Sequence, residues 1–170
     1  MKSKKNLVFL GMMGSGKSSV GSMVSKKLRI NFFDIDKLIE SEQKMTISKI
    51  FEKKGETFFR EIEKRTTLDI LKNDHSVIAL GGGAFLNRDI RKEVLKNHLS
   101  FWLSWESKTL IDRIKNSKKR PLALNSSRNE LSQIIKKRSQ IYSKALYKIN
   151  CDDFTKQEIA KKIISIYETN

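Results

Sequence analysis

The chain has 170 residues, which is the size of one ordinary globular domain. Apolar residues make up 38% of it and charged residues 32%, so one core beneath a strongly hydrated surface is expected. No apolar stretch approaches the roughly 20 residues of a membrane-spanning helix. Eight glycines and one cysteine exclude collagen-like and disulfide-rich classes.

The formal net charge of +16 favours anionic partners, among them nucleic acids, anionic membranes and phosphorylated metabolites. The basic residues are scattered, however, and the densest runs, at 2–5, 118–120 and 136–138, are short. A lysine-rich surface with no dedicated partner is therefore the simpler interpretation. Cys151 stands alone, which excludes an intrachain disulfide and suits a reducing cytosol. The basic and then apolar start lacks a small-residue cleavage site, so we expect a cytoplasmic protein rather than a secreted one.

Short apolar runs alternate with segments of helical periodicity along the chain. Strands are predicted at 6–10, 30–33, 76–80, 99–103 and 147–151. Helices are predicted at 17–28, 37–43, from Thr46 to a break at Gly55, and at 56–71, 89–96, 107–114, 130–145 and 155–167. A polar stretch at 116–129 carries the only proline. This order predicts one α/β domain over residues 1–170, in three layers, with a five-stranded parallel sheet flanked by helices and ligands at the carboxyl ends of the strands.

Residues 11–18, GMMGSGKS, match the phosphate-loop pattern G-x-x-x-x-G-K-[ST] between a predicted buried strand and a predicted helix. Glycines allow backbone N–H groups to converge on phosphate oxygens, and the helix N-terminus adds about half a positive charge. In such a loop Lys17 reaches the β- and γ-phosphates and the Ser18 hydroxyl binds Mg²⁺. The alternative, a chance glycine turn, would not require both the motif and its context. The sequence therefore predicts a nucleoside triphosphate site on a P-loop NTPase fold.

Two carboxylates, Asp34 and Asp36, follow the second predicted strand. Beside a phosphate site, one can serve the metal and the other can orient or deprotonate a substrate hydroxyl. The simpler alternative is that Asp36 caps the helix that follows. The phosphate loop favours the functional interpretation.

Several further motifs stand in a fixed order: DID at 34–36, GETFFREIE at 55–63, ALGGGA at 79–84, RPL at 120–122 and RSQIY at 138–142. Together with GMMGSGKS they cover nearly the whole chain and resemble the shikimate kinase family, P-loop small-molecule kinases of the nucleoside-monophosphate-kinase type. The resemblance implies phosphorylation of the 3-hydroxyl of shikimate by ATP, with Mg²⁺, to give shikimate 3-phosphate and ADP.

The resemblance also implies roles for particular residues. ATP would contact Gly14, Ser15, Gly16, Lys17, Ser18, Ser19, Arg113, Arg120 and Asp152. Ser18 and Asp34 would hold Mg²⁺, Asp34 through water. Shikimate would contact Asp36, Arg60, Gly81, Gly82, Gly83 and Arg138, with a guanidinium fork suited to its carboxylate. Lys17, Asp36 and Arg120 would be catalytic. A substrate-binding subregion at about 34–62 and a mobile lid at about 115–128 would complete the fold.

Each assignment has a simpler alternative. Arg60 can pair with Glu56 or Glu63 along a helix, Arg120 and Arg138 can be solvated charges, and residues 81–83 can form a plain loop. Trp102, Trp105 and Tyr142 are interpreted as packing. At the level of function, a P-loop kinase of another small acceptor such as gluconate is one alternative. A basic nucleic-acid-binding ATPase is another, although the chain has no aromatic RNA-binding motif. We expect ATP and shikimate as partners, no nucleic acid or membrane, and a monomer.

Overall fold

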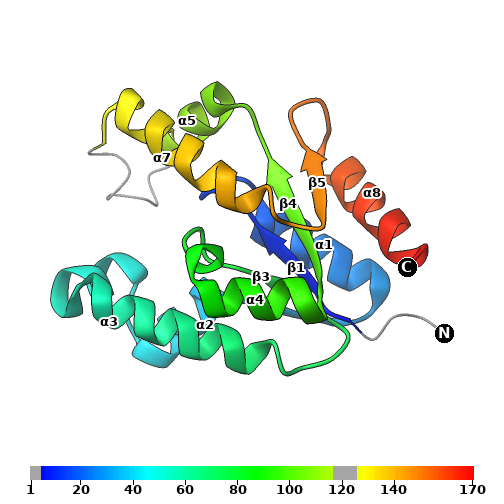
Figure 1. Ribbon diagram of the computed structural model, residues 1–170, viewed down its shortest axis with the longest axis horizontal. Helices are drawn as coiled ribbons and strands as arrows, with labels where there is room; N and C mark the ends of the chain where they lie inside the picture. The colour runs from blue at the N-terminus through cyan, green and yellow to red at the C-terminus, as the bar shows by residue number, and fades with distance from the viewer. Residues whose placement is uncertain (1–4, 117–125) are drawn as a thin grey trace.

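The computed structural model describes residues 5–116 and 126–170. Its centre is a parallel sheet in the order β2-β3-β1-β4-β5 (Figure 1). The strands are β1 (Leu7–Leu10), β2 (Asn31–Asp34), β3 (Ser76–Ala79), β4 (Leu99–Ser104) and β5 (Tyr147–Asn150). Because all five run in the same direction, their carboxyl ends lie at one edge of the sheet, where ligands are expected.

Helices cover both faces of this sheet and produce the three predicted layers. On one face lie α1 (Lys17–Leu28) and α8 (Lys156–Glu168), which pack against Leu7 and Phe9 of β1. On the other lie α2 (Ile35–Gln43), α3 (Ile47–Ile70), α4 (Arg88–Asn97), α5 (Ser107–Lys115) and α7 (Arg128–Tyr142), against Val8 and Leu10. Successive residues of a strand point to opposite faces, so a strand that is apolar throughout serves both layers. The predicted fold class is confirmed.

Local capping explains where several helices begin. Thr46 accepts from the backbone N–H of Lys49 at the start of α3, as predicted. At the start of α2, the capping residue is Asp34, whose side chain accepts from the N–H of Lys37. The alternative in which Asp36 caps is therefore wrong, and the helix begins two residues earlier than predicted. Asp36 instead lies in the first turn of α2.

Gly55, with φ 82° and ψ 169°, is non-helical and kinks α3, so the predicted break separates two helical segments there. Residues 81–83 form a glycine loop after β3. A short 3₁₀ helix, η1 (Ala84–Leu86), follows this glycine loop and was not predicted. Helix α7 ends at Tyr142, three residues before the predicted end. Among the described residues, no helix combines the length and hydropathy that a membrane crossing requires.

Candidate active site

The phosphate loop connects β1 to α1 and curls at the carboxyl edge of the sheet. Gly14 and Gly16 have φ values of 81° and 90°, in the left-handed region that side chains with a Cβ rarely adopt. The backbone N–H of Ser15 donates to the carbonyl of Met12 at 3.2 Å, and Gly16 is the residue that precedes α1. This is the geometry that directs a run of N–H groups and a helix N-terminus at an anion.

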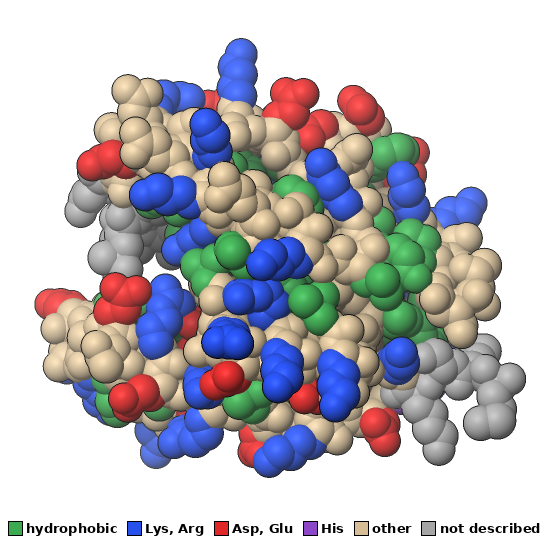
Figure 2. Space-filling model, viewed as in Figure 1, with side chains coloured by type: hydrophobic (Ala, Val, Ile, Leu, Met, Phe, Trp, Pro, Cys, Tyr) green, Lys and Arg blue, Asp and Glu red, His purple; other side chains and the backbone are tan. Residues whose placement is uncertain are grey.

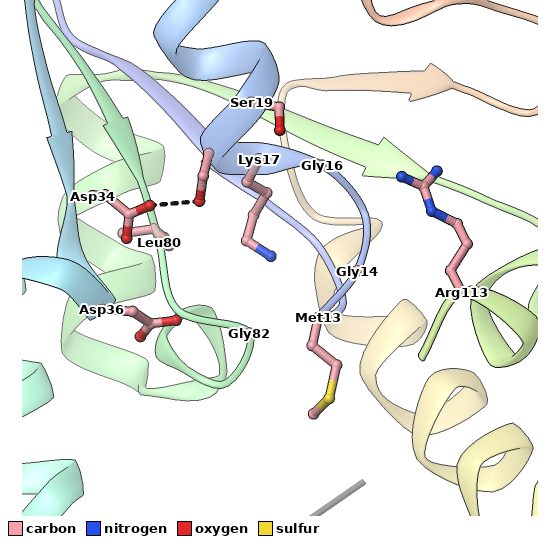
Figure 3. Close-up of a pocket in the computed structure, with 11 residues that line it drawn as sticks. Met13, Gly14, Gly16, Lys17, Ser19, Asp34, Asp36, Leu80, Gly82 and Arg113 are labelled. Carbon is pink, nitrogen blue, oxygen red and sulfur yellow. Dashed lines mark hydrogen bonds between the residues drawn. The ribbon is translucent and has the colours of Figure 1, made fainter. Parts of the chain in front are cut away.

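Lys17 and Ser18 follow the loop, and their predicted roles toward phosphate and Mg²⁺ stay predictions. The ammonium of Lys17 lies 2.9 Å from the carbonyl oxygen of Gly11 and 3.0 Å from that of Met12. The hydroxyl of Ser18 donates to Asp34 Oδ2 at 2.5 Å (Figure 3). The cation at the mouth of the loop and the adjacent pair of oxygens are the two features that a metal–triphosphate ligand needs.

These groups share one pocket with Asp36. Figure 3 shows Lys17, Asp34 and Asp36 around a common space, with Arg113 on the far side of the loop. The pocket measures about 340 Å³, which is in the range of small-molecule sites. It is lined by Met13, Gly14, Gly16, Lys17, Ser18, Ser19, Asp34, Asp36, Leu80, Gly82 and Arg113. Ser15, which belongs to the loop, is buried and does not line the pocket.

The glycine loop after β3 lies between two carboxylates and an arginine. A Cβ at Gly81 would lie 2.6 Å from Glu63 Oε1 and 2.7 Å from Asp36 Oδ1, and one at Gly83 would lie 2.8 Å from Arg60 Cζ. The side chains of Asp36, Glu63 and Arg60 thus approach this backbone closely because the glycines have no side chains of their own. Asp36 and Arg60, which the sequence places on different helices, meet at this loop.

Arg60 also forms the ion pairs along α3 that the simpler interpretation of this residue predicts. Its guanidinium lies 2.7 Å from Glu63 and 3.3 Å from Glu56. Burial alone would lower the pKa of Arg60, but the two glutamates outweigh it and raise that pKa. Glu63 is 3% exposed and its Oε1 has no hydrogen-bond partner. Burial raises the pKa of Glu63, against the opposing effect of Arg60.

Helix α7 closes the other side of the glycine loop. A Cβ at Gly82 would lie 3.7 Å from Arg138 Nη1, and the same nitrogen lies 3.8 Å from the sulfur of Met12. One turn further along, the hydroxyl of Tyr142 donates to the carbonyl of Gly82. Tyr142 packs in the core as predicted, but it also fixes the loop, which sequence reasoning missed. Burial raises the pKa of this phenol, so it remains a donor.

On the opposite side of the phosphate loop, Arg113 lies over the ring of Trp105, 4.2 Å from its centroid. The indole N–H of Trp105 donates to the carbonyl of Ser15 at 2.9 Å. Asp152 does not line the pocket. Its carboxylate accepts from the backbone N–H of Glu106 at 2.9 Å and so ties the β5–α8 loop to the start of α5.

Arg120 and most of the predicted lid lie outside the described residues. The described residues on either side are held together, because Lys115 donates to the carbonyl of Ser126 and Arg128 lies 2.8 Å from Asp112. The positive charge of the surface shows no single concentration on the face in Figure 2, where acidic side chains lie among Lys and Arg.

A phosphate loop on a parallel sheet, opening into a pocket of small-molecule size lined by two aspartates and one arginine, defines a P-loop kinase of a small acceptor. The family model described as shikimate kinase matches residues 13–168. The chain therefore belongs to the shikimate kinase family and is an enzyme with shikimate kinase activity.

Individual relatives agree with this. A shikimate kinase of Bacillus subtilis is 41% identical over 165 residues, covering 95% of this chain and 88% of the relative. The solved structure of shikimate kinase from Acinetobacter baumannii in complex with shikimate has a TM-score of 0.91 at 29% identity, covering 99% of this chain and 96% of that chain. A gluconokinase from Sinorhizobium meliloti reaches a TM-score of 0.56 at 13% identity, covering 99% of this chain and 94% of that chain, and shares the fold alone.

Proposed function

We propose that the pocket described above transfers the γ-phosphoryl group of ATP to the 3-hydroxyl of shikimate. The observation that carries this proposal is the contact between the two glycine loops. A Cβ at Gly82 would lie 3.3 Å from the backbone nitrogen of Met13 and 3.9 Å from the carbonyl oxygen of Gly11. The loop that faces the acceptor residues thus touches the phosphate loop, so donor and acceptor would meet without a long movement of either.

On the donor side, the backbone of residues 14–19 would hold the phosphates and Lys17 would neutralise the β- and γ-oxygens. Arg113 and the loop that contains Asp152 would flank the adenine. Arg120 would add charge to the transferred group from a lid at about 115–128.

The family generally uses ATP with Mg²⁺, and the donor set fits that ion. Mg²⁺ prefers oxygen ligands, keeps several waters and is held by one or two protein groups plus substrate phosphates. Ser18 and Asp34 offer a hydroxyl and a carboxylate oxygen side by side. Among residues 5–116 and 126–170 no group of three or more His, Cys, Asp or Glu could hold a metal by itself. When bound, Mg²⁺ supplies charge neutralisation on the phosphate oxygens.

On the acceptor side, Arg60 and Arg138 would grip the shikimate carboxylate, and residues 81–83 would approach the ring closely through their backbone. Asp36 would accept a hydrogen bond from the 3-hydroxyl and take its proton. The hydroxyl oxygen bonds to the γ-phosphorus, the bond between that phosphorus and the β–γ bridging oxygen breaks, and ADP leaves. We propose that a monomer is active, with the acceptor subregion at about 34–62 within one kinase domain.

The test is a coupled assay of ADP release with shikimate, gluconate and nucleoside monophosphates as acceptors. Turnover that requires both Mg²⁺ and shikimate is expected. No ADP release with shikimate would reject the proposal, and preference for gluconate would favour the alternative kinase.

A further inference from the structure

Trp105 occupies the junction between the nucleotide pocket and the core. It follows the carboxyl end of β4 and precedes Glu106, the N-cap position of α5. Its side chain is half-buried and packs against the apolar clusters on both faces of the sheet. A residue used only for packing would make such contacts. Trp105 makes two others, both with the nucleotide side of the site.

The first contact acts on the phosphate loop. The indole N–H of Trp105 donates to the Ser15 carbonyl, which is 90 positions away in the sequence, at 2.9 Å. That carbonyl and the N–H of Gly16 belong to one peptide unit. In a planar trans peptide the two groups point in opposite directions. Holding the carbonyl outward on Trp105 therefore turns the Gly16 N–H the other way, and Gly16 lines the pocket with Gly14 and Lys17.

The second contact acts on Arg113. The guanidinium carbon lies 4.2 Å from the centroid of the Trp105 ring, which is a favourable cation–π distance. Arg113 lines the pocket, and a Cβ at Gly16 would lie 4.0 Å from its Nη2. The Trp105 ring thus holds the Arg113 cation beside Gly16, the same residue whose N–H the indole orients.

We propose that Trp105 is a positioning residue for the phosphoryl donor. One side chain orients the Gly16 N–H toward the phosphates and holds Arg113 beside the nucleotide. The assignment deepens the proposed function and rests on it, since it requires that ATP bind in this loop. It concerns the donor only, because both contacts lie on the nucleotide side of the pocket.

Trp105→Phe separates positioning from packing, because phenylalanine keeps an aromatic face for Arg113 but has no N–H for Ser15. We expect the dissociation constant for ADP, measured by calorimetry, and the KM for ATP to rise about three- to tenfold, as for the loss of one hydrogen bond. The KM for shikimate should stay unchanged. Tyr147→Phe is the matched control, because it removes the hydrogen bond that the Tyr147 hydroxyl donates to Asn170. Tyr147 lies at the amino-terminal end of β5, away from the phosphate loop. This substitution should alter neither constant.

A fluorescence measurement on a second variant keeps the test independent of how Trp105→Phe folds. The chain has two tryptophans, so Trp102→Phe leaves Trp105 as the only indole. ADP should change its emission, and shikimate alone should not. Wild-type ADP affinity in Trp105→Phe, or an indole that does not respond to ADP in Trp102→Phe, would overturn the inference. Failure of the wild-type protein to bind ADP would instead overturn the proposed function itself.

Discussion

Replacement of Gly83 by alanine tests whether Arg60 is held for the acceptor carboxylate or serves the helix alone. A Cβ at position 83 would lie 2.8 Å from Arg60 Cζ and 2.9 Å from Nη2. Ordinary contact between such atoms is about 3.5–4.0 Å, so the guanidinium must move by roughly 1 Å. The neighbour is the end of a flexible side chain, so the fold should persist while the position of the guanidinium changes.

The size of the effect follows from the bonds at stake. A hydrogen bond to a charged group contributes about 1.5–3 kcal/mol, and about 1.4 kcal/mol corresponds to a factor of ten. Gly83→Ala should therefore raise the KM for shikimate about 10- to 100-fold. The dissociation constant for ADP should not change, because Arg60 does not line the nucleotide pocket.

A double-mutant cycle with Arg60→Ala identifies the cause. If the alanine acts by displacing Arg60, then Gly83→Ala adds little once Arg60 is gone. Gly82→Ala is the comparison that acts elsewhere, since its Cβ would lie 3.3 Å from the backbone nitrogen of Met13 and in ordinary contact, 3.7 Å, with Arg138. Its effect should therefore persist in the Arg60→Ala background. Steady-state kinetics of the four proteins in each cycle give the coupling. Additive effects of Gly83→Ala and Arg60→Ala, or an unchanged KM for shikimate in Gly83→Ala, would refute the reasoning.

Three further changes probe single groups. Asp36→Asn should lower kcat about 10²- to 10⁴-fold, as for loss of a general base, and leave ADP binding by calorimetry intact. Tyr142→Phe leaves the Gly82 carbonyl without its donor; urea unfolding should show a loss of about 1–3 kcal/mol, and kinetics a higher KM for shikimate. Glu63 has a raised pKa in the folded protein, so the folded state holds more protons than the unfolded state at pH values between the ordinary and the raised pKa. Its contribution to the free energy of unfolding is therefore largest below the ordinary pKa and falls as the pH rises through this interval. Glu63→Gln should remove this decrease in the free energy of unfolding with pH. If urea unfolding of the wild type and of Glu63→Gln gave the same pH dependence across the interval, the reasoning would be contradicted.

The layers of the fold were predictable because their signals are local. The apolar run at residues 7–10 is buried on both faces of the sheet, as continuous apolarity in a parallel strand predicts. Helix boundaries were less certain where two groups competed. Asp34 and Asp36 are both possible caps, and only the direction of the chain after β2 decides for Asp34.

The geometry of the phosphate loop was also predictable, since residues 11–18 fold upon themselves. The proposed acceptor half joins α2, α3, α7 and the glycine loop, and its residues were predicted through motif order rather than through local physics. Glu63 shows the difference. Its position three residues after Arg60 predicts the ion pair, but its approach to Gly81 depends on how α3 packs against the loop after β3.

Trp105 and Tyr142 were both interpreted as packing, and for the same reason: a large aromatic residue is usually apolar core, and its single polar atom has no sequence signal. In the structure each polar atom binds one backbone carbonyl of a glycine-containing loop, Ser15 for Trp105 and Gly82 for Tyr142. Such loops need glycine for close approach of ligands, and glycine also makes their peptide planes free to rotate. A donor anchored in the core removes that freedom at one peptide in each loop without adding a side chain to the pocket. Rigid peptide orientation on the donor and acceptor sides would thus come from two core aromatic residues, Trp105 outside the motifs and Tyr142 at the end of RSQIY. Substitutions there should alter binding of one substrate each.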